Sequence, residues 1–316
     1  MKFTIKRLLL LLLLTVSIFP LVLFGQSSPE IINFWDNSYL INPASINPKY
    51  KSEIIVSHRS QWVGLEGAPQ TNFVAAALSS EKLKSQIGVK IVSDKIGYYS
   101  LTDCNLAYSY FIRFRKSRLN FGISGIFSAL VLDASKIYSE VENDPILFMR
   151  INNNYKFDAD LGMEYVQENF RVGFSSNRIF DIFADNSNPN LRNNTNYLYT
   201  LYRQQSDNFI NFGVGLSIIN NKFATLAEVN LSTFIRPDPE SNPFQLGVSY
   251  RTNKQISFQT GIYIGANLKL LYSYEIDYSK LGLRTGGTHE LMLRFRIERN
   301  RQWGFRHYYD NLNFDY

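Results

Sequence analysis

The chain has 316 residues, of which 45% are hydrophobic and 15% aromatic, and its formal net charge is +6. This length and apolar content exclude a disordered chain and suffice for a large core or one large barrel. The Lys and Arg residues lie singly among apolar residues, so we expect no nucleic-acid partner. Because the single Cys104 and three dispersed histidines give neither an intramolecular disulfide nor metal-ligand spacing, we expect no metal, cofactor or enzymatic site.

The amino end has the pattern of a secretory signal. Three basic residues within the first seven positions precede an apolar run that reaches about Phe24, and Gly25 offers a small residue for cleavage. We therefore predict a signal peptide over residues 1–25, cleaved near Gly25. A retained membrane anchor is the alternative, and Pro20 disfavours it. Residues 26–51 are polar and rich in turn signals, and we expect them to form a periplasmic leader.

The rest of the chain is dominated by segments in which apolar and polar residues alternate. Strand side chains point to opposite faces with period two, so each segment has one apolar and one polar face. The alternation is cleanest from residue 255 to 298, where Leu271 breaks the polar set, and it is weakest over 195–205 and 222–234. We predict fourteen strands, at about residues 52–62, 71–79, 85–93, 101–114, 118–132, 156–166, 169–177, 195–205, 209–220, 222–234, 243–252, 255–265, 267–277 and 288–298.

Connection lengths distinguish a soluble sandwich from a membrane barrel. Every second connection is short, whereas the others include the long segments 133–155, 178–194 and 278–287. Short turns at one end and long loops at the other are typical of outer-membrane barrels, and strands near ten residues match a tilted membrane crossing. We therefore predict one transmembrane antiparallel outer-membrane β-barrel over residues 52–298 and a tail over 299–316. The even strand number puts both chain ends in the periplasm.

Charged residues of both signs fall on the face opposite the apolar one, which predicts a polar lumen with cross-strand ion pairs. A barrel this wide admits water unless the leader or the loop over 133–155 fills it. Closure requires the last strand to pair with the first, so we expect Arg59 to meet Glu290 and to fix the register of this seam. Pairing of either charge with another residue is the alternative. The residues that we expect at the seam and in the lumen are Arg59, Glu290, Glu275, Asp277 and Arg251.

Three peptides carry more specific information. They are RSQWVGLEGAPQT over 59–71, SDKIG over 93–97 and GGTHELML over 286–293, and Asn42-Pro43-Ala44 precedes them. Together with Tyr250-Arg251 and the Tyr272–Glu275 run, this ordered set resembles the PorP/SprF family over about residues 40–298. The resemblance implies an outer-membrane barrel of Bacteroidota that works with the type IX secretion and gliding machinery. Such a barrel would help to export or hold proteins with a C-terminal sorting domain, including surface adhesins. A passive solute channel is the alternative.

Several of these residues have simpler structural interpretations. Trp62 shares the parity of the lipid-facing residues before it and would sit in the outer aromatic belt. The peptide with Asp94, Lys95 and Gly97 is explained by a tight turn, and contact with a partner is the second interpretation. In the tail, we expect basic and aromatic residues to dock an inner component of the machinery, although a disordered terminus is equally compatible. These tail residues are Arg299, Arg301, Trp303 and Arg306.

Overall fold

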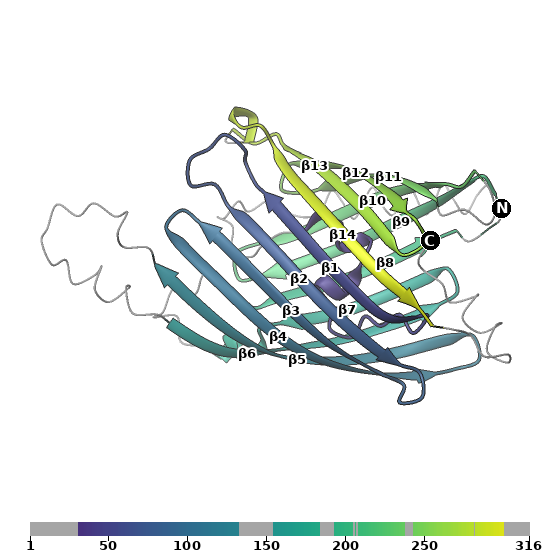
Figure 1. Cartoon of the computed structure of the whole chain (residues 1–316). Coiled ribbons are helices and arrows are strands. Elements are labelled where there is room, and N and C mark those ends of the chain that lie inside the picture. Colours follow the sequence, from purple (N-terminus) through teal and green to yellow (C-terminus); the bar gives the residue numbers. More distant parts are fainter. Residues whose placement is uncertain are drawn as a thin grey trace, which may run out of the picture.

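The computed structural model describes residues 31–132, 154–183, 193–204, 206, 208–237, 243–280 and 282–299. Within them, fourteen strands form one closed antiparallel barrel in which β1 pairs with β14 (Figure 1). The predicted all-β barrel of about fourteen strands is therefore confirmed, while the predicted signal peptide lies outside the described residues. The strands are β1 (Tyr50–Ser60), β2 (Gln70–Ser80), β3 (Ser85–Ile96), β4 (Tyr99–Arg113), β5 (Ser117–Leu132), β6 (Asn154–Gln167), β7 (Phe170–Asn177), β8 (Thr195–Arg203), β9 (Ile210–Asn221), β10 (Thr225–Ile235), β11 (Phe244–Arg251), β12 (Gln255–Ile264), β13 (Leu268–Asp277) and β14 (Thr288–Glu298).

The two faces of the wall differ as the alternation predicts. In β2, Phe73 and Ala75 point inward and are buried, whereas Val74 and Leu78 point outward with exposed fractions of 44% and 65%. Most buried side chains of the wall are polar, and most large exposed side chains are apolar. This distribution is the reverse of that in a soluble protein, and it suits a barrel whose outer face contacts lipid.

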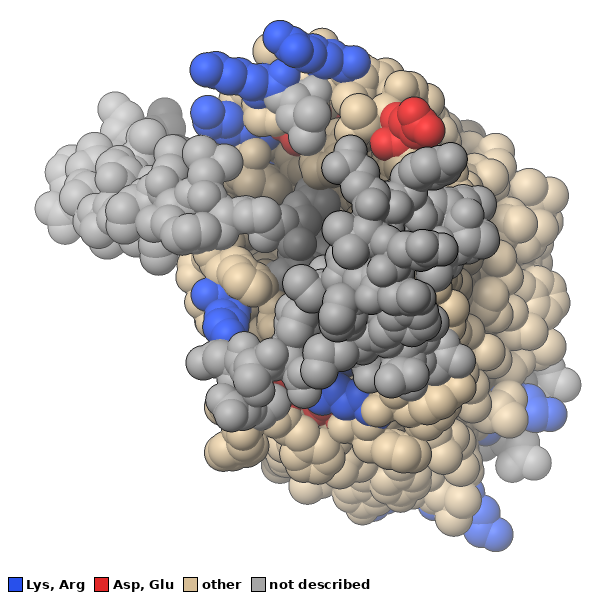
Figure 2. Space-filling model, turned by 90° about the vertical axis from the view of Figure 1, so that its left-hand side faces the viewer, with Lys and Arg blue, Asp and Glu red and all other residues tan. Residues whose placement is uncertain are grey.

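The long connections lie at one end of the barrel, which we call the outer end. It carries the connections that follow β1, β3, β5, β7, β9, β11 and β13, including the short helices η4 (Ile179–Phe183) and η5 (Gly282–Arg284). Seen from this end, Lys and Arg side chains gather at the top of the view, and others lie singly elsewhere on the surface (Figure 2). No helix among the described residues is long and apolar enough to span a membrane.

The segment before β1 lies inside the barrel. Residues 31–49 contain the helices η1 (Ile32–Trp35) and η2 (Ser38–Leu40), which appear in Figure 1 as the purple turns enclosed by the strands. Nearly all of these residues are buried. The predicted periplasmic leader is therefore wrong for this part of the chain. We call residues 31–49 the plug.

Candidate functional site

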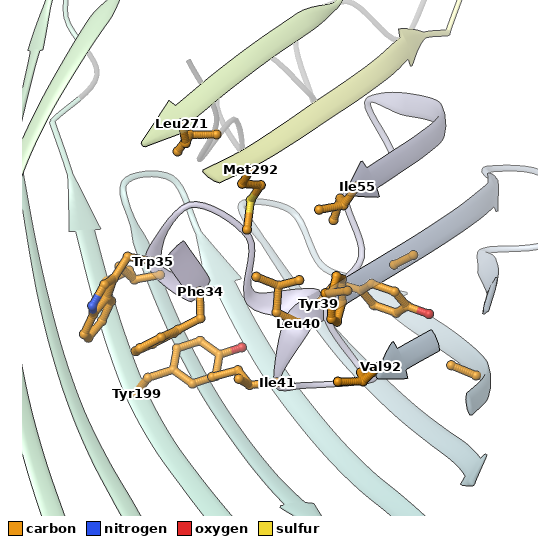
Figure 3. Close-up of a cluster of buried hydrophobic side chains, with 14 of the residues drawn as sticks. Phe34, Trp35, Tyr39, Leu40, Ile41, Ile55, Val92, Tyr199, Leu271 and Met292 are labelled. Atoms are coloured by element: carbon orange, nitrogen blue, oxygen red, sulfur yellow. The ribbon is translucent and has the colours of Figure 1, made fainter. Parts of the chain in front are cut away.

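The plug is held first by apolar contacts at the centre of the lumen. Phe34, Trp35, Tyr39, Leu40 and Ile41 are at most 4% exposed and belong to one cluster with inward-facing wall residues (Figure 3). The labelled wall residues come from five strands, which range from β1 at the start of the barrel to β14 at its end. They are Ile55, Val92, Tyr199, Leu271 and Met292.

The sequence contained one sign of the plug. Some strands carry apolar residues at positions whose side chains point into the lumen, where polar residues are expected. Leu271 breaks the polar set of β13 because its side chain packs against the plug instead of facing water. Ile55 and Met292 likewise lie on the polar parity of their strands and are buried at the same cluster. Apolar side chains on the lumen face therefore indicate that something apolar fills the lumen.

An ion cluster anchors the middle of the plug. The Asp36 carboxylate accepts from Lys269 Nζ at 2.6 Å and pairs with Arg294. Arg294 Nη1 also donates to the Asp36 carbonyl oxygen at 3.0 Å. Burial would raise the pKa of Asp36, but Arg294 and Lys269 together hold it well below its ordinary value. The carboxylate is therefore charged at neutral pH and bound on two sides.

The outer part of the plug binds the seam between β14 and β1. Glu290 accepts from the backbone N–H groups of Ile32 and Asn33 at 2.9 and 3.2 Å, and from Asn33 Nδ2 at 2.9 Å. On its other side, Glu290 lies opposite Arg59 in the strand register, with Arg59 Nη1 3.6 Å from Glu290 Oε2. Arg59 Nη2 also donates to Glu275 at 2.9 Å. The structure thus brings the expected seam pair together and adds the plug as a third partner.

Arg251 continues this network along the wall. Its guanidinium contacts Glu228 at 2.8 Å and Glu275 at 4.0 Å. Glu228 in turn accepts from Trp35 Nε1 at 2.7 Å, so the network also reaches the plug. Because removing one partner of a buried ion pair leaves an uncompensated charge, this chain of contacts couples the plug to β10, β11 and β13.

The inner part of the plug approaches the wall at glycines. Asn42 Nδ2 donates to the carbonyl oxygens of Met163 and Phe174 at 3.2 Å each, which places it between β6 and β7. A Cβ atom at Gly122 would collide with the backbone of Pro43 and Ala44, and one at Gly162 would collide with the Asn42 side chain. The Asn42-Pro43-Ala44 motif of the sequence is therefore a docking element of the plug.

Asp277 and Trp62 lie at the outer mouth. The first strand ends at Ser60, and Trp62 has a φ of 48°, which turns its side chain out of the strand parity. Its indole Nε1 lies 3.4 Å from Asp277 Oδ2 and the residue is only half-exposed. The predicted lipid-facing position of Trp62 is therefore wrong, because its conformation directs the ring towards a lumen carboxylate.

The three sequence peptides meet at this same rim. Val63 and the Gly286-Gly287 pair exchange two backbone hydrogen bonds of 2.9 and 2.7 Å, and Gly97 N–H donates to the Gly67 carbonyl at 2.9 Å. Together, the three peptides cover the outer ends of β14, β1, β2 and β3, next to the seam. We call this surface the motif rim.

The individual residues proposed as partner contacts have different environments. Asp94 is buried and accepts from the Thr71 hydroxyl at 2.7 Å, whereas Lys95 is exposed and points outward. At the other end of the barrel, Arg299 Nη2 donates to the Ser79 carbonyl at 2.6 Å. Arg301, Trp303 and Arg306 lie outside the described residues.

Nothing in the described part of the chain indicates catalytic or metal chemistry. No group of three or more His, Cys, Asp or Glu in these residues is placed to hold a metal ion. A cavity of about 80 Å³ remains beside the plug, lined among others by Ile31, Lys90 and Arg178.

Comparison with known proteins gives a family match over most of the chain. The family described as "Type IX secretion system membrane protein PorP/SprF" matches residues 23–295. No curated protein sequence matches the chain.

Solved structures that resemble the fold include a hydrocarbon channel, a toluene transporter and an outer membrane protein. The CymD monoaromatic hydrocarbon channel has a TM-score of 0.50 at 10% identity, covering 88% of this chain and 95% of the other. The Ralstonia pickettii toluene transporter TbuX has a TM-score of 0.49 at 10% identity, with coverages of 84% and 94%. The Acinetobacter baumannii outer membrane protein Omp33 has a TM-score of 0.47 at 9% identity, with coverages of 80% and 100%. At such identities the likeness concerns the fold alone.

Proposed function

Because the chain belongs to the PorP/SprF family of type IX secretion system membrane proteins, we propose that it helps to export or anchor proteins at the cell surface. The cargo would carry a C-terminal sorting domain, and surface adhesins are the expected examples. The barrel fold and the family match place the chain in the outer membrane, in contact with lipid. The family consists of secretion-system membrane proteins, and the chain is not an enzyme. We further propose that residues 1–25 are a signal peptide, which is cleaved near Gly25 to give the mature protein.

One observation favours this role over a passive solute channel. The plug occupies the middle of the lumen, where it is fixed by the Asp36 ion cluster and by the hydrogen bonds to Glu290. A diffusion channel requires a continuous aqueous path, whereas a scaffold for partner proteins requires a stable wall and rim. The fixed plug in the lumen therefore supports a binding and assembly role within the secretion and gliding machinery.

The experiment compares secretion with conductance. Cells that lack the chain should lose surface-exposed proteins with C-terminal sorting domains, or gliding, while other outer-membrane proteins remain. The purified barrel in planar bilayers should be closed for most of the recording time. Steady conductance without partner proteins, combined with normal secretion in the deletion strain, would instead establish the passive channel.

A further inference from the structure

The outer half of β6 is paired on one side only. Residues 154–160 pair with β5, but the pairing of β6 with β7 begins at Leu161, opposite Ser176. No strand in the described part of the chain pairs with residues 154–160 on the side away from β5. We call these residues the open edge.

Arg178 explains why β7 stops short. This residue has a φ of 60°, a left-handed conformation that ends the strand directly after Asn177. Its backbone N–H donates to Asp160 Oδ1 at 2.9 Å, and its guanidinium pairs with the buried Asp103 inside the barrel. The chain is thus drawn towards inward-facing carboxylates, and η4 continues in contact with β6, where Phe180 N–H donates to Asp158.

The neighbours of the open edge show to which side of β6 its backbone N–H and C=O groups point. Further along β6, the Met163 carbonyl points towards β7, because Asn42 bridges it to the Phe174 carbonyl. Ala159, which has the same parity, gives its N–H to the Asp158 carboxylate and not to β5. By this parity, the N–H and C=O groups of Tyr155 and Phe157 also face away from β5.

Aromatic side chains flank the open edge on its outward face. Tyr155 and Phe157 are 63% and 73% exposed, and both rings contact Phe127 of β5, with centroid distances of 5.6 and 5.1 Å. Since an aromatic side chain can bury 150–250 Å², these two residues leave roughly 300 Å² available to a partner. This apolar area lies directly beside the outward-facing backbone groups of the open edge.

The outer part of the open edge, from Phe157 towards Asn154, lies at or beyond the outer membrane surface. A tilted strand crosses the hydrocarbon core in about 9–11 residues, whereas β6 has 14 residues and β5 has 16. Counted from the inner end at Gln167, a crossing of about eleven residues ends near Phe157. Unpaired backbone groups are not tolerated in hydrocarbon, which also requires this edge to lie outside it or to be covered by polypeptide.

We propose that the open edge accepts an extended peptide of a partner protein by β-strand addition. The peptide backbone would bond to Tyr155 and Phe157, and alternate side chains would be apolar outward, beside the two rings, and polar inward, beside Lys156 and Asp158. A lipid chain has no groups for these backbone donors and acceptors. The chain's own segment 184–192 is rich in Asn and contains Pro189, which disfavours a strand. Identification of the partner as an exported protein rests on the proposed function.

The test uses intact cells with the complete machinery. A photoreactive benzoylphenylalanine replaces Tyr155, and the same residue at Phe121, on the lipid-facing part of β5, is the control. Adducts are identified by mass spectrometry. We expect position 155, but not position 121, to give an adduct with an alternating apolar and polar segment of an exported protein.

Two substitutions at one position separate backbone pairing from apolar contact. Phe157→Pro removes the N–H that faces the partner, while Phe157→Val keeps it. This N–H takes no part in the pairing with β5, so the pairing survives both changes. We expect Phe157→Pro to lower the adduct yield at least tenfold and Phe157→Val to change it less than threefold. Folding is checked by heat-modifiable mobility on a semi-native gel. If Phe157→Pro does not fold, Phe157→Lys, which protects an edge by charge, serves in its place.

Each contrary outcome has a definite meaning. Adducts only with residues 133–153 or 184–192 of this chain, or only with lipid, would show that the edge is not a partner site. Equal adduct yields for the proline and valine variants would also overturn the proposal. If secretion is normal in these variants but lost in cells without the chain, the strand-addition site fails and the proposed function stands.

Discussion

Replacing Asp36 with asparagine is expected to loosen the plug without unfolding the barrel. The substitution leaves Lys269 and Arg294 buried together with no carboxylate between them. Breaking a buried ion pair by removing one partner costs about 3–5 kcal/mol. Because the strands keep all their ladder hydrogen bonds, this loss falls on the docked state of the plug and not on the barrel.

This loss of free energy predicts that the plug leaves its docked position much more often, but that it is not released completely. At about 1.4 kcal/mol per tenfold, a loss of about 3–5 kcal/mol raises the population of the undocked plug roughly 140- to 3700-fold. Burial of Phe34, Trp35, Leu40 and Ile41 still contributes about 1.5–3 kcal/mol for each side chain. The variant plug should therefore be docked most of the time.

Cysteine labelling measures this population. Ser38, which is 1% exposed in the plug, is changed to cysteine in a chain whose exposed Cys104 is changed to serine. The rate of reaction with a bulky maleimide should rise at least 100-fold when Asp36→Asn is added. The control is Glu298→Gln, which breaks the exposed pair with Lys49 and should change the rate less than about fivefold. Equal rates with and without Asp36→Asn would refute the role of the ion cluster.

The same cluster predicts how the plug responds to acid. Since the docked plug holds the pKa of Asp36 below its ordinary value of 3.8, the anchor is complete above pH 3.8 and is lost as the pH falls towards the lowered pKa. The difference in single-barrel conductance between the unchanged chain and Asp36→Asn should be the same at pH 7 and pH 5 and should shrink below pH 3.8. A difference that already shrinks between pH 7 and pH 5 would contradict the assignment to Asp36.

The remaining predictions concern the wall, the seam and the tail. Gly122→Val should open the barrel to ions because its side chain collides with the plug, whereas Gly125→Val on the same strand, with open space around it, should not; equal conductance of the two variants would refute the close fit. Arg59→Glu and Glu290→Arg should each reduce the heat-resistant folded band on a semi-native gel. The double swap should recover only part of it, because position 290 must also accept N–H groups from the plug. A double variant no better than the worse single one would exclude a seam pair. Deleting residues 301–316 should leave the barrel assembled but lower secretion or gliding, and unchanged function would show that the tail does not dock an inner component of the machinery.

The sequence by itself determined the wall of this protein. Alternation with period two is a local property, so residues such as Leu106, Tyr108 and Tyr110 reveal a strand without any knowledge of its neighbours. Closure of the barrel follows from the same information, because a sheet in lipid cannot leave an edge and its last strand must meet its first. The register that brings Arg59 opposite Glu290 could therefore be anticipated from two segments that are far apart in sequence.

The plug and the open edge were decided only by the tertiary structure. Residues 31–49 have no regular period, and their partners come from strands spread over the whole chain, so no local pattern assigns them to the lumen. Leu271 carried the signal as a break in alternation, but a single break does not say which segment it faces. The short β7 likewise depends on Arg178, whose conformation follows from a buried pair with Asp103 on another strand. Periodicity records which side of a strand is apolar. What occupies the lumen on the other side is fixed only when groups that are distant in sequence meet there and their charges must be compensated.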